Sequence, residues 1–410
     1  GVLAIWVEAG WGGGGLAAGG ARAAAGGPAP PPPPTGPRDG LAASSRACRA
    51  HHRLPGLHPA PAFVRAVAGA VRTGRYDVVF GAGEAEVVAL SAARDVVAAA
   101  GAVVPHGPHE QLLRAVDKTE LSRAASAVGI AVPDVLGAED VPDERTACIV
   151  KADRHANPDV AGSPPRIDTT VVTGRTAVVR RVEEIHTLGA QAQVQVLHPG
   201  TLIAYAAVRG PGGVVAESMQ RAERIWPPGA GASARAVTVD VDEELAARAQ
   251  ALLASLDLLG LAELQYVRDA DGTARLIDLN ARFYGSLSLA VAAGANLPAA
   301  WGDVALGRSP RPVRARPAVR YQWGTADVRR AVAERRGGLA RDLAATLAAA
   351  PGAQHSVASL RDPGPALARL GAGLRSGRAT GSGPSGGDAA QVRGVVVPQH
   401  LPRPARVPRR

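Results

Sequence analysis

Residues 260–298 read GLAELQYVRDADGTARLIDLNARFYGSLSLAVAAGANLP, and the pattern predicts a β-hairpin followed by a helix. Residues 261–268 and 274–280 each alternate at a period of two, which is typical of half-buried strands. Between them, Asp271 and Gly272 form an Asp-Gly pair, a strong turn signal, and we expect them at the centre of a type I′ turn. The position of the turn then fixes how the two strands pair.

This pairing places Gln265 opposite Asp278 and Glu263 opposite Asn280, with all four side chains on one face of the hairpin. Two carboxylates and two amides have too many oxygens for a dry core, because buried polar groups need partners. A hard cation such as Mg²⁺ would satisfy them, and the neighbouring Arg282 offers a forked donor for phosphate or carboxylate. The alternative is an edge hairpin whose polar face is solvated.

The composition is that of a folded protein with a basic C-terminal part. The chain has 410 residues, 46% of them hydrophobic, which is enough for two or three domains. The net charge is +10, and residues 307–410 account for it because they hold nineteen Arg against five Asp or Glu. Aromatic residues make up only 3%, so base-stacking surfaces for nucleic acid are poorly supplied. Cys48 and Cys148 alone imply no disulfide framework, which favours a reducing cytoplasmic location.

Lysine is nearly absent from this arginine-rich chain. Among 46 Lys and Arg residues, only Lys118 and Lys151 are lysines. A compact ammonium group can contact a phosphate where a planar guanidinium would not fit. Lys118 lies in the first turn of a helix expected over residues 117–128, where its charge opposes the helix dipole unless an anion is near; the alternative is a surface lysine. Lys151 ends a short buried strand expected over residues 147–150.

Other segments have clear local patterns. We expect helices over residues 62–72, 85–100, 243–256, 327–333 and 339–349, and strands over residues 76–80, 192–197, 202–208, 214–218 and 319–323. Residues 1 to about 40 are rich in Gly, Ala and Pro and are expected to be unstructured, unless they hold the remains of a first βα unit. Arg221 and Arg224 follow the strand that ends at Ser218, and they either hold a substrate carboxylate or are surface arginines.

The hairpin and the two lysines together resemble the ATP-grasp superfamily, nearest its carbamoyl-phosphate-synthetase-like branch of carboxylate–amine ligases. The resemblance rests on Gln265, followed thirteen positions later by Asp278-Leu279-Asn280-Ala281-Arg282 and then by Gly285-Ser286. Asp278 stands where glutamate is usual, and Ala281 stands where proline is usual. The shorter aspartate keeps the charge but would hold a metal ion differently.

The resemblance implies an α/β fold class, specifically the α+β ATP-grasp fold. An α/β N-terminal domain would precede a two-lobed ATP-grasp domain whose antiparallel sheets grip ATP. The implied domains are residues 1–40, low-complexity and disordered; 41–115, an α/β pre-ATP-grasp domain; 116–310, the ATP-grasp domain, with a small lobe over 116–195 and a large lobe over 196–310; 311–375, a C-terminal α/β extension; and 376–410, a disordered basic tail.

The resemblance also implies roles for individual residues. In the family, the hairpin holds magnesium on the ATP phosphates, basic residues contact those phosphates, and a hinge strand contacts adenine largely through its backbone. The corresponding residues here are Gln265, Asp278 and Asn280 for the metal; Lys118 and Lys151 for the phosphates; Gln195, Val196 and Leu197 for adenine; and Arg282 as the catalytic residue that steadies the γ-phosphate or the substrate. Val196 stands where glutamate is usual.

The implied activity is that of a cytoplasmic ATP-dependent carboxylate–amine ligase, which forms C–N bonds and uses ATP with Mg²⁺, or with Mn²⁺ in its place. A small-molecule carboxylate would be phosphorylated to an acyl phosphate and then attacked by an amine or a similar nucleophile. No apolar run is long enough to cross a membrane, and neither a membrane nor nucleic acid is an expected partner.

Two alternatives to a ligase stay open at this point. Residues 152–166, at the position of the family's phosphate-covering loop, contain only Gly162-Ser163 and three prolines. Such a loop offers few backbone amides to an anion, and it would suit a nucleotide-binding or regulatory homologue without turnover. The basic C-terminal tail would suit a nucleic-acid binder whose affinity depends steeply on salt.

Overall fold

The computed structural model describes residues 4–7, 42–48, 50, 52, 54–55, 57, 60–154 and 167–370. Most of the segment expected to be unstructured, most of the loop at residues 152–166, and the basic tail fall outside these residues. The chain divides into two units, Gly1–Leu367 and Ala368–Arg410, and the architecture below is that of the first. Within the described residues, no helix is long and apolar enough to cross a membrane.

The N-terminal domain is an α/β layer built around two parallel strands. Its elements are β1 (Ala4–Val7), η1 (Ala42–Ser44), α1 (Ala60–Gly74), β2 (Val78–Gly81), α2 (Glu84–Ala92) and α3 (Arg94–Ala98). Because β1 pairs in parallel with β2, the expectation of an unstructured segment is wrong for residues 4–7. The helix expected over residues 85–100 is interrupted at Ala93, which separates α2 from α3. Phe63 of α1 and Val97 of α3 are buried in the core of this layer.

The small lobe is a four-stranded antiparallel sheet covered on one face by a helix. Its elements are β3 (Val135–Leu136), η2 (Ala138–Asp140), β4 (Ala147–Ala152), β5 (Thr170–Thr173), α6 (Arg175–Thr187) and β6 (Ala192–Val196), and the strand order is β3-β6-β4-β5. Val150 and Val194 pack with Ile185 of α6 in one core. Side chains alternate along a strand, so Lys151 and its cross-strand partner Gln193 lie on the opposite face of this sheet.

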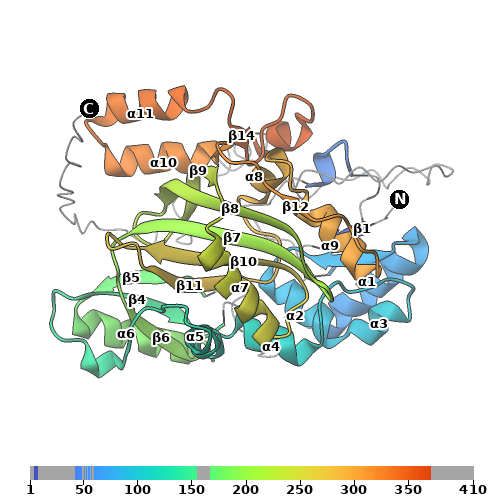
Figure 1. Ribbon diagram of the computed structural model, residues 1–410, viewed down its shortest axis with the longest axis horizontal. Coiled ribbons are helices and arrows are strands. Elements are labelled where there is room, and N and C mark those ends of the chain that lie inside the picture. Colours follow the sequence, from blue (N-terminus) through green and yellow to red (C-terminus); the bar gives the residue numbers. More distant parts are fainter. Residues whose placement is uncertain are drawn as a thin grey trace, which may run out of the picture. The chain divides into compact units, whose positions relative to one another are not determined.

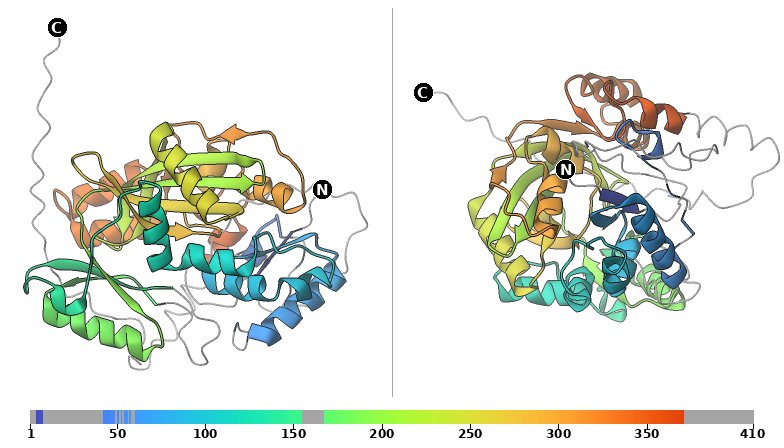
Figure 2. Two further views of the ribbon diagram at one scale, coloured as in Figure 1. Left: turned by 60° about the horizontal axis from the view of Figure 1, so that its bottom comes forward. Right: turned by 90° about the vertical axis from the view of Figure 1, so that its right-hand side faces the viewer.

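The large lobe is an eight-stranded sheet with the hairpin at one end (Figures 1 and 2). Its strands are β7 (Thr201–Gly210), β8 (Gly213–Trp226), β9 (Ala232–Val239), β10 (Gly260–Arg268), β11 (Ala274–Asn280), β12 (Val313–Arg314), β13 (Arg320–Gln322) and β14 (Gln354–His355). The order is β11-β10-β7-β8-β9-β13-β14, with β12 beside β8.

Helices cover both faces of the large sheet. They are α4 (His109–Val116), α5 (Lys118–Ala127), α7 (Glu243–Ser255), α8 (Leu287–Ala292) and α9 (Leu297–Ala305). Tyr205 packs with residues of α4, α5 and α7 in one core, whereas the next residue of β7, Ala206, packs with residues of α8 and α9 in another. Since neighbouring side chains of a strand point to opposite faces, the two cores lie on the two sides of the sheet.

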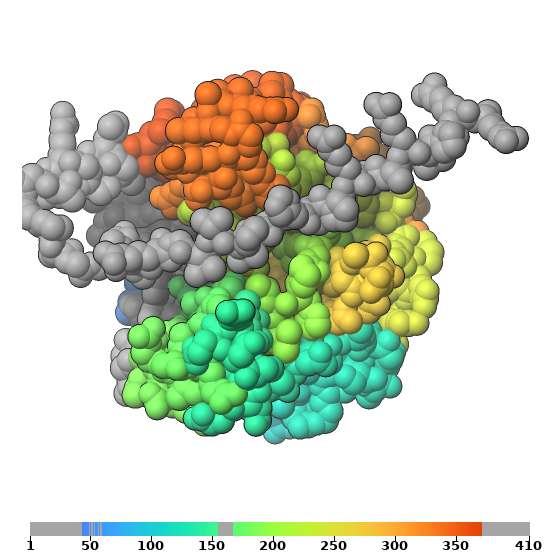
Figure 3. Space-filling model, turned by 90° about the vertical axis from the view of Figure 1, so that its left-hand side faces the viewer, coloured from blue at the N-terminus to red at the C-terminus, as the bar shows by residue number. Residues whose placement is uncertain are grey.

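Two further helices, α10 (Gly324–Glu334) and α11 (Leu339–Ala348), pack against each other, and α10 also packs on β8 and β9. They form the orange pair in Figure 3. The strand β8 continues to Trp226, eight residues beyond the end expected at Ser218. Arg221 and Arg224 therefore lie inside a strand rather than after one.

The hairpin has the expected strands and residue pairs but not the expected turn. The pairs are Glu263 with Asn280 and Gln265 with Asp278. The connection is a five-residue loop over residues 269–273, in which the N–H of Gly272 donates to the carbonyl oxygen of Asp269 (3.2 Å). The two-residue type I′ turn is therefore wrong.

A β-bulge in β11 explains why the expected pairs form nonetheless. Gln265 pairs with Asp278, but the next residue of β10, Tyr266, pairs with Leu276, so Ile277 is an extra residue. The loop shifts the register by one residue and the bulge shifts it back. Because the side-chain period of a strand is two, this second shift returns the polar residues of β11 to the face of Gln265.

An aromatic cluster joins the N-terminal domain to the large lobe. The ring of Phe80 in β2 lies 4.8 Å from that of Trp301 in α9 and 5.2 Å from that of Phe283, measured between centroids. His106 meets Trp301 edge to face at 5.1 Å. The indole N–H of the fully buried Trp301 donates to the carbonyl oxygen of Pro105 (2.6 Å). Such aromatic pairs add to the burial of their surface.

We expect Trp301→Ala to lower the free energy of unfolding by about 3–5 kcal/mol, because it leaves a cavity in this cluster. Trp301→Phe keeps a ring but loses the hydrogen bond to Pro105, and should cost about 1–2 kcal/mol. Urea denaturation followed by circular dichroism measures both values. Equal losses would mean that the hydrogen bond, rather than ring packing, dominates this contact.

Candidate functional site

Glu263 is the centre of the polar face of the hairpin. Its Oε2 atom accepts a hydrogen bond from Nε2 of Gln265 (3.0 Å) and another from Nδ2 of Asn280 (3.0 Å). Both amide groups thus use an N–H on the same carboxylate, and each keeps its carbonyl oxygen for another partner. The sequence predicted that Glu263 lies on this face but gave it no function, although its position opposite Asn280 was a usable signal.

The carboxyl group of Glu263 is buried, with 2% of the residue exposed. Burial raises its pKa to about 7, although the hydrogen bond from Gln265, the charge of Arg282 and the hydrogen bond from Asn280 all act in the opposite direction. The charge of Asp278 raises this pKa further. A cation at the hairpin face would stabilise the ionised form of the Glu263 carboxyl group and so lower its pKa.

Lys118 is buried against the hairpin, so the surface alternative is wrong. It is the first residue of α5, whose N-cap Asp117 accepts from two backbone N–H groups of the first turn. Only 2% of its side chain is exposed, and its Nζ forms an ion pair with Oδ1 of Asp278. A lysine at a helix N-terminus opposes the helix dipole unless an anion lies near it. Here that anion is Asp278, which the resemblance implies as a metal ligand.

Lys151 reaches the same strand from the small lobe. Its Nζ donates to the carbonyl oxygen of Ile277, the extra residue of the bulge (2.8 Å). Burial lowers the pKa of Lys151 to about 7, and the charge of Lys118 lowers it further while that of Asp278 raises it. The bulge therefore positions Asp278 for one lysine and presents a backbone oxygen to the other.

Arg282 follows the hairpin and lies near Glu263, whose pKa its charge lowers. Its Nη1 donates to the carbonyl oxygen of Phe283 (2.9 Å). Its Nε is buried and has no hydrogen-bond partner among the residues that the structure describes. A guanidinium with unused donors beside this face is suited to an oxyanion.

The hinge residues lie on the small-lobe strand β6. Gln195 is buried and donates from Nε2 to Oε1 of Gln193 (3.0 Å), a residue that the sequence did not single out. The backbone N–H of Val196 donates to Asp134 (3.0 Å), and that of Leu197 donates to Ala147 (3.1 Å). These two N–H groups are used within the small lobe, so a base beside them would have to contact other backbone atoms.

The side chains of the hairpin face fit a hard divalent cation. They offer a carboxylate from Asp278, amide oxygens from Gln265 and Asn280, and the nearby carboxyl group of Glu263. Oxygen donors of this kind suit Mg²⁺, which usually takes one or two carboxylates. The ammonium of Lys118 already lies on Asp278, so the position attracts positive charge. No group of three or more His, Cys, Asp or Glu suited to a metal occurs in the described part of the chain.

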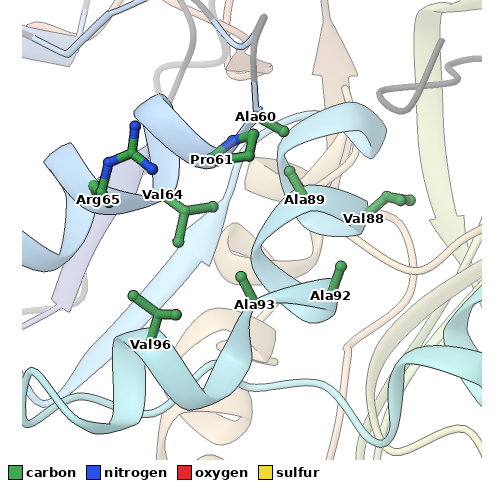
Figure 4. A pocket seen from close by; sticks show the side chains of 9 residues that line it. All are labelled: Ala60, Pro61, Val64, Arg65, Val88, Ala89, Ala92, Ala93 and Val96. Atoms are coloured by element: carbon green, nitrogen blue, oxygen red, sulfur yellow. The ribbon is translucent and has the colours of Figure 1, made fainter.

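A separate pocket of about 260 Å³ lies in the N-terminal domain between α1, α2 and α3 (Figure 4). Its walls are apolar, as Val64, Val88 and Val96 illustrate, and Arg65 is its charged lining residue. It contains none of the residues discussed above. Because convergent polar groups are what orient a ligand for chemistry, we place the candidate site at the hairpin instead.

One family model matches part of the sequence. A family model described as ATP-grasp in the biosynthetic pathway with Ter operon matches residues 215–327, which include the whole hairpin. No curated protein matches the sequence.

Solved structures resemble the chain at low sequence identity. The biotin carboxylase domain of the Hydrogenobacter thermophilus 2-oxoglutarate carboxylase, solved with MgADP and bicarbonate, is 9% identical over 68% of this chain and 66% of its own, with a TM-score of 0.54. The L-amino acid ligase from Bacillus licheniformis is 16% identical over 63% of this chain and 64% of its own, with a TM-score of 0.46. The chain thus spans slightly less than two thirds of either structure. The chain therefore resembles this ATP-grasp family model over residues 215–327, and it shares its fold with the biotin carboxylase domain.

Proposed function

We propose that this protein is an ATP- and Mg²⁺-dependent ligase of the carbamoyl-phosphate-synthetase-like branch, which activates a carboxylate as an acyl phosphate for attack by an amine or a similar nucleophile. The observation that supports this most is the meeting of both lysines of the chain with the hairpin face. Lys118 contacts Asp278, and Lys151 contacts the adjacent Ile277. Cations beside an oxygen-rich face are what a metal–triphosphate complex requires.

In the proposed reaction, an oxygen of the substrate carboxylate attacks the γ-phosphorus of ATP, and ADP leaves. The nucleophile then displaces phosphate from the acyl phosphate. Lys118 and Lys151 would hold the phosphates, and Arg282 would steady the γ-phosphate or the carboxylate. Magnesium bound to Gln265, Asp278 and Asn280 would supply neutralising charge. Glu263 would hold the two amide groups so that their oxygens face the metal.

The charges of the two lysines would favour binding of phosphates at this site. Lys118 neutralises Asp278, and Lys151 is buried on a carbonyl oxygen that only partly satisfies its charge. Incoming phosphates would give both ammonium groups an anionic partner. We assign no side chain as general base. Binding without turnover would favour the alternative of a nucleotide-binding or regulatory homologue.

The first test is calorimetric titration with ATP, with and without Mg²⁺. Lys151→Ala and Asp278→Asn should each weaken Mg²⁺-dependent binding at least tenfold, about 1.4 kcal/mol or more, because each removes a charge at the phosphates or the metal. Arg123→Ala is the matched control, since Arg123 lies exposed on α5 and pairs only locally with Glu120. Unchanged binding in both site variants would overturn the assigned site.

Glu263→Gln tests the orienting function of the buried carboxyl group. The variant loses a charge and places a third amide beside those of Gln265 and Asn280. We therefore expect its affinity for the metal ion to be ten- to hundredfold lower. Mn²⁺ titration monitored by electron paramagnetic resonance gives the metal affinity directly, and thermal unfolding checks the fold. A metal affinity equal to that of the wild type would show that Glu263 does not orient the ligands.

The lowered pKa of Lys151 also predicts how stability depends on pH. The unfolded chain binds this proton up to a pKa near 10.5 and the folded chain only up to about 7, so burial of Lys151 destabilises the fold most below pH 7. Lys151→Met should therefore be more stable than the wild type at pH 6, by on the order of 3 kcal/mol, with the difference shrinking toward pH 10. Denaturation across this pH range measures it. A difference independent of pH would contradict the assigned cause.

A further inference from the structure

His106 is a buried polar side chain that the proposed reaction does not use. Only 5% of the residue is exposed, and its ring packs on the indole of Trp301. Its Nε2 lies 3.2 Å from the carbonyl oxygen of Ala281, a residue 175 positions later in the chain. Ala281 stands between Asn280, an implied metal ligand, and Arg282, the implied catalytic residue. His106 therefore contacts the backbone of the candidate site directly.

The ring of His106 is a neutral hydrogen-bond donor. Burial lowers its pKa to about 4, although the hydrogen bond to Ala281 raises it, and the charge of Arg94 adds to the lowering. A neutral imidazole carries one N–H, and a carbonyl oxygen can only accept, so the proton lies on Nε2. Nδ1 is buried and has no hydrogen-bond partner among the residues that the structure describes. The polar function of this ring is thus its bond to Ala281.

The segment that holds His106 meets the hairpin at both ends of its backbone. After β11, Ala281 accepts the bond from the imidazole. At the first residue of β10, a Cβ on Gly260 would lie 2.9 Å from the carbonyl oxygen of Pro105 and 2.3 Å from Nε1 of Trp301. This close approach is possible because glycine has no side chain. Residues 105–106 therefore hold the open end of the hairpin, opposite the loop over residues 269–273.

Arg282 lies between two anchored residues. Ala281 before it is 2% exposed, and Phe283 after it is 1% exposed. The ring of Phe283 packs on those of Phe80 (5.2 Å) and Trp301 (5.1 Å), measured between centroids. A planar peptide group that is held at its carbonyl oxygen fixes the direction in which the next residue leaves it. The two anchors thus set the backbone of Arg282, whose charge acts on the hairpin face.

We propose that His106 is a positioning residue: through the carbonyl oxygen of Ala281, it holds Arg282 in the orientation in which its guanidinium meets an oxyanion at the hairpin face. The catalytic consequence rests on the proposed ligase function, in which Arg282 steadies the γ-phosphate or the carboxylate. Because a displacement of about 1 Å in a reacting group can cost about a hundredfold in rate, a bond that fixes the backbone matters more for turnover than for stability.

Variants of the full chain separate the hydrogen bond of His106 from the packing of its ring. His106→Phe keeps a ring against Trp301 but removes the donor, and His106→Asn removes the bond with a smaller side chain, because its amide is too short to reach. His106→Gln restores an N–H near the position of Nε2. Phe63→Leu is the matched control for lost packing, since Phe63 is fully buried in a different core.

Hydrogen exchange measured by mass spectrometry tests the anchor without any ligand. Exchange in a peptide spanning residues 280–286 should be about three- to tenfold faster in His106→Phe and His106→Asn, the range expected for the loss of one hydrogen bond. His106→Gln should exchange less than twofold faster than the wild type, and so should Phe63→Leu. Wild-type exchange in both His106→Phe and His106→Asn would overturn the proposal.

Kinetics then tests the catalytic consequence. With a carboxylate that supports ADP release, His106→Phe should lower kcat at least tenfold and change KM for Mg²⁺-ATP less than twofold, because the lysines and the metal hold the nucleotide. His106→Gln should recover most of the lost kcat. Phe63→Leu should lower the unfolding temperature but leave kcat unchanged. Equal losses of kcat in His106→Phe and Phe63→Leu would mean that His106 is a structural residue only.

A double-mutant cycle shows whether His106 acts through Arg282. Once Arg282→Met has removed the guanidinium, adding His106→Phe should change kcat less than twofold further. Losses that multiply would mean that His106 affects the site by another route. If no carboxylate supports ADP release, the ligase function fails while hydrogen exchange still decides the anchor. If turnover occurs and His106→Phe keeps the wild-type kcat, the positioning function fails while the ligase function stands.

Discussion

Buried positive charge at an edge strand sets the relation between the two lobes. The ammonium groups of Lys118 and Lys151 are almost completely removed from water, and each finds its partner on β11, at Asp278 and at the carbonyl oxygen of Ile277. An unpaired ion at this depth would cost several kcal/mol, so α5 and β4 must both lie close to β11. A hydrogen bond from the backbone N–H of Leu276 to the carbonyl oxygen of Ala131 (2.8 Å) adds a third contact along the same edge.

The sequence predicted this region well where local chemistry determines it. Period-two alternation identified both arms of the hairpin, and the rarity of lysine identified two buried cations. The pairing of Gln265 with Asp278 was correct although the assumed turn was wrong. A longer loop and a bulge cancel each other in register, and the alternation of side chains contains no signal for either one alone. The roles implied for individual residues remain predictions.

Features that depend on distant partners were not predictable from one sequence. The strand at residues 4–7 is recognised only through its parallel partner, more than seventy residues away. The hydrogen bonds that Glu263 accepts from the amide groups of Gln265 and Asn280 depend on the side-chain rotamers of residues on two strands. In a chain so rich in arginine, nothing local distinguishes the buried Arg330 from a surface residue. Only the packing of α10 against α11 and the sheet reveals its partners.

The contact between Lys118 and Asp278 has a consequence for folding. Many small metal-binding domains are unfolded until their metal binds, because metal binding supplies their folding free energy. Here the chain supplies its own counterion, because the ammonium group of Lys118 neutralises Asp278. Under the proposed function, metal uptake would exchange one cation for another at Asp278. Folding of the hairpin would then not depend on binding of the metal.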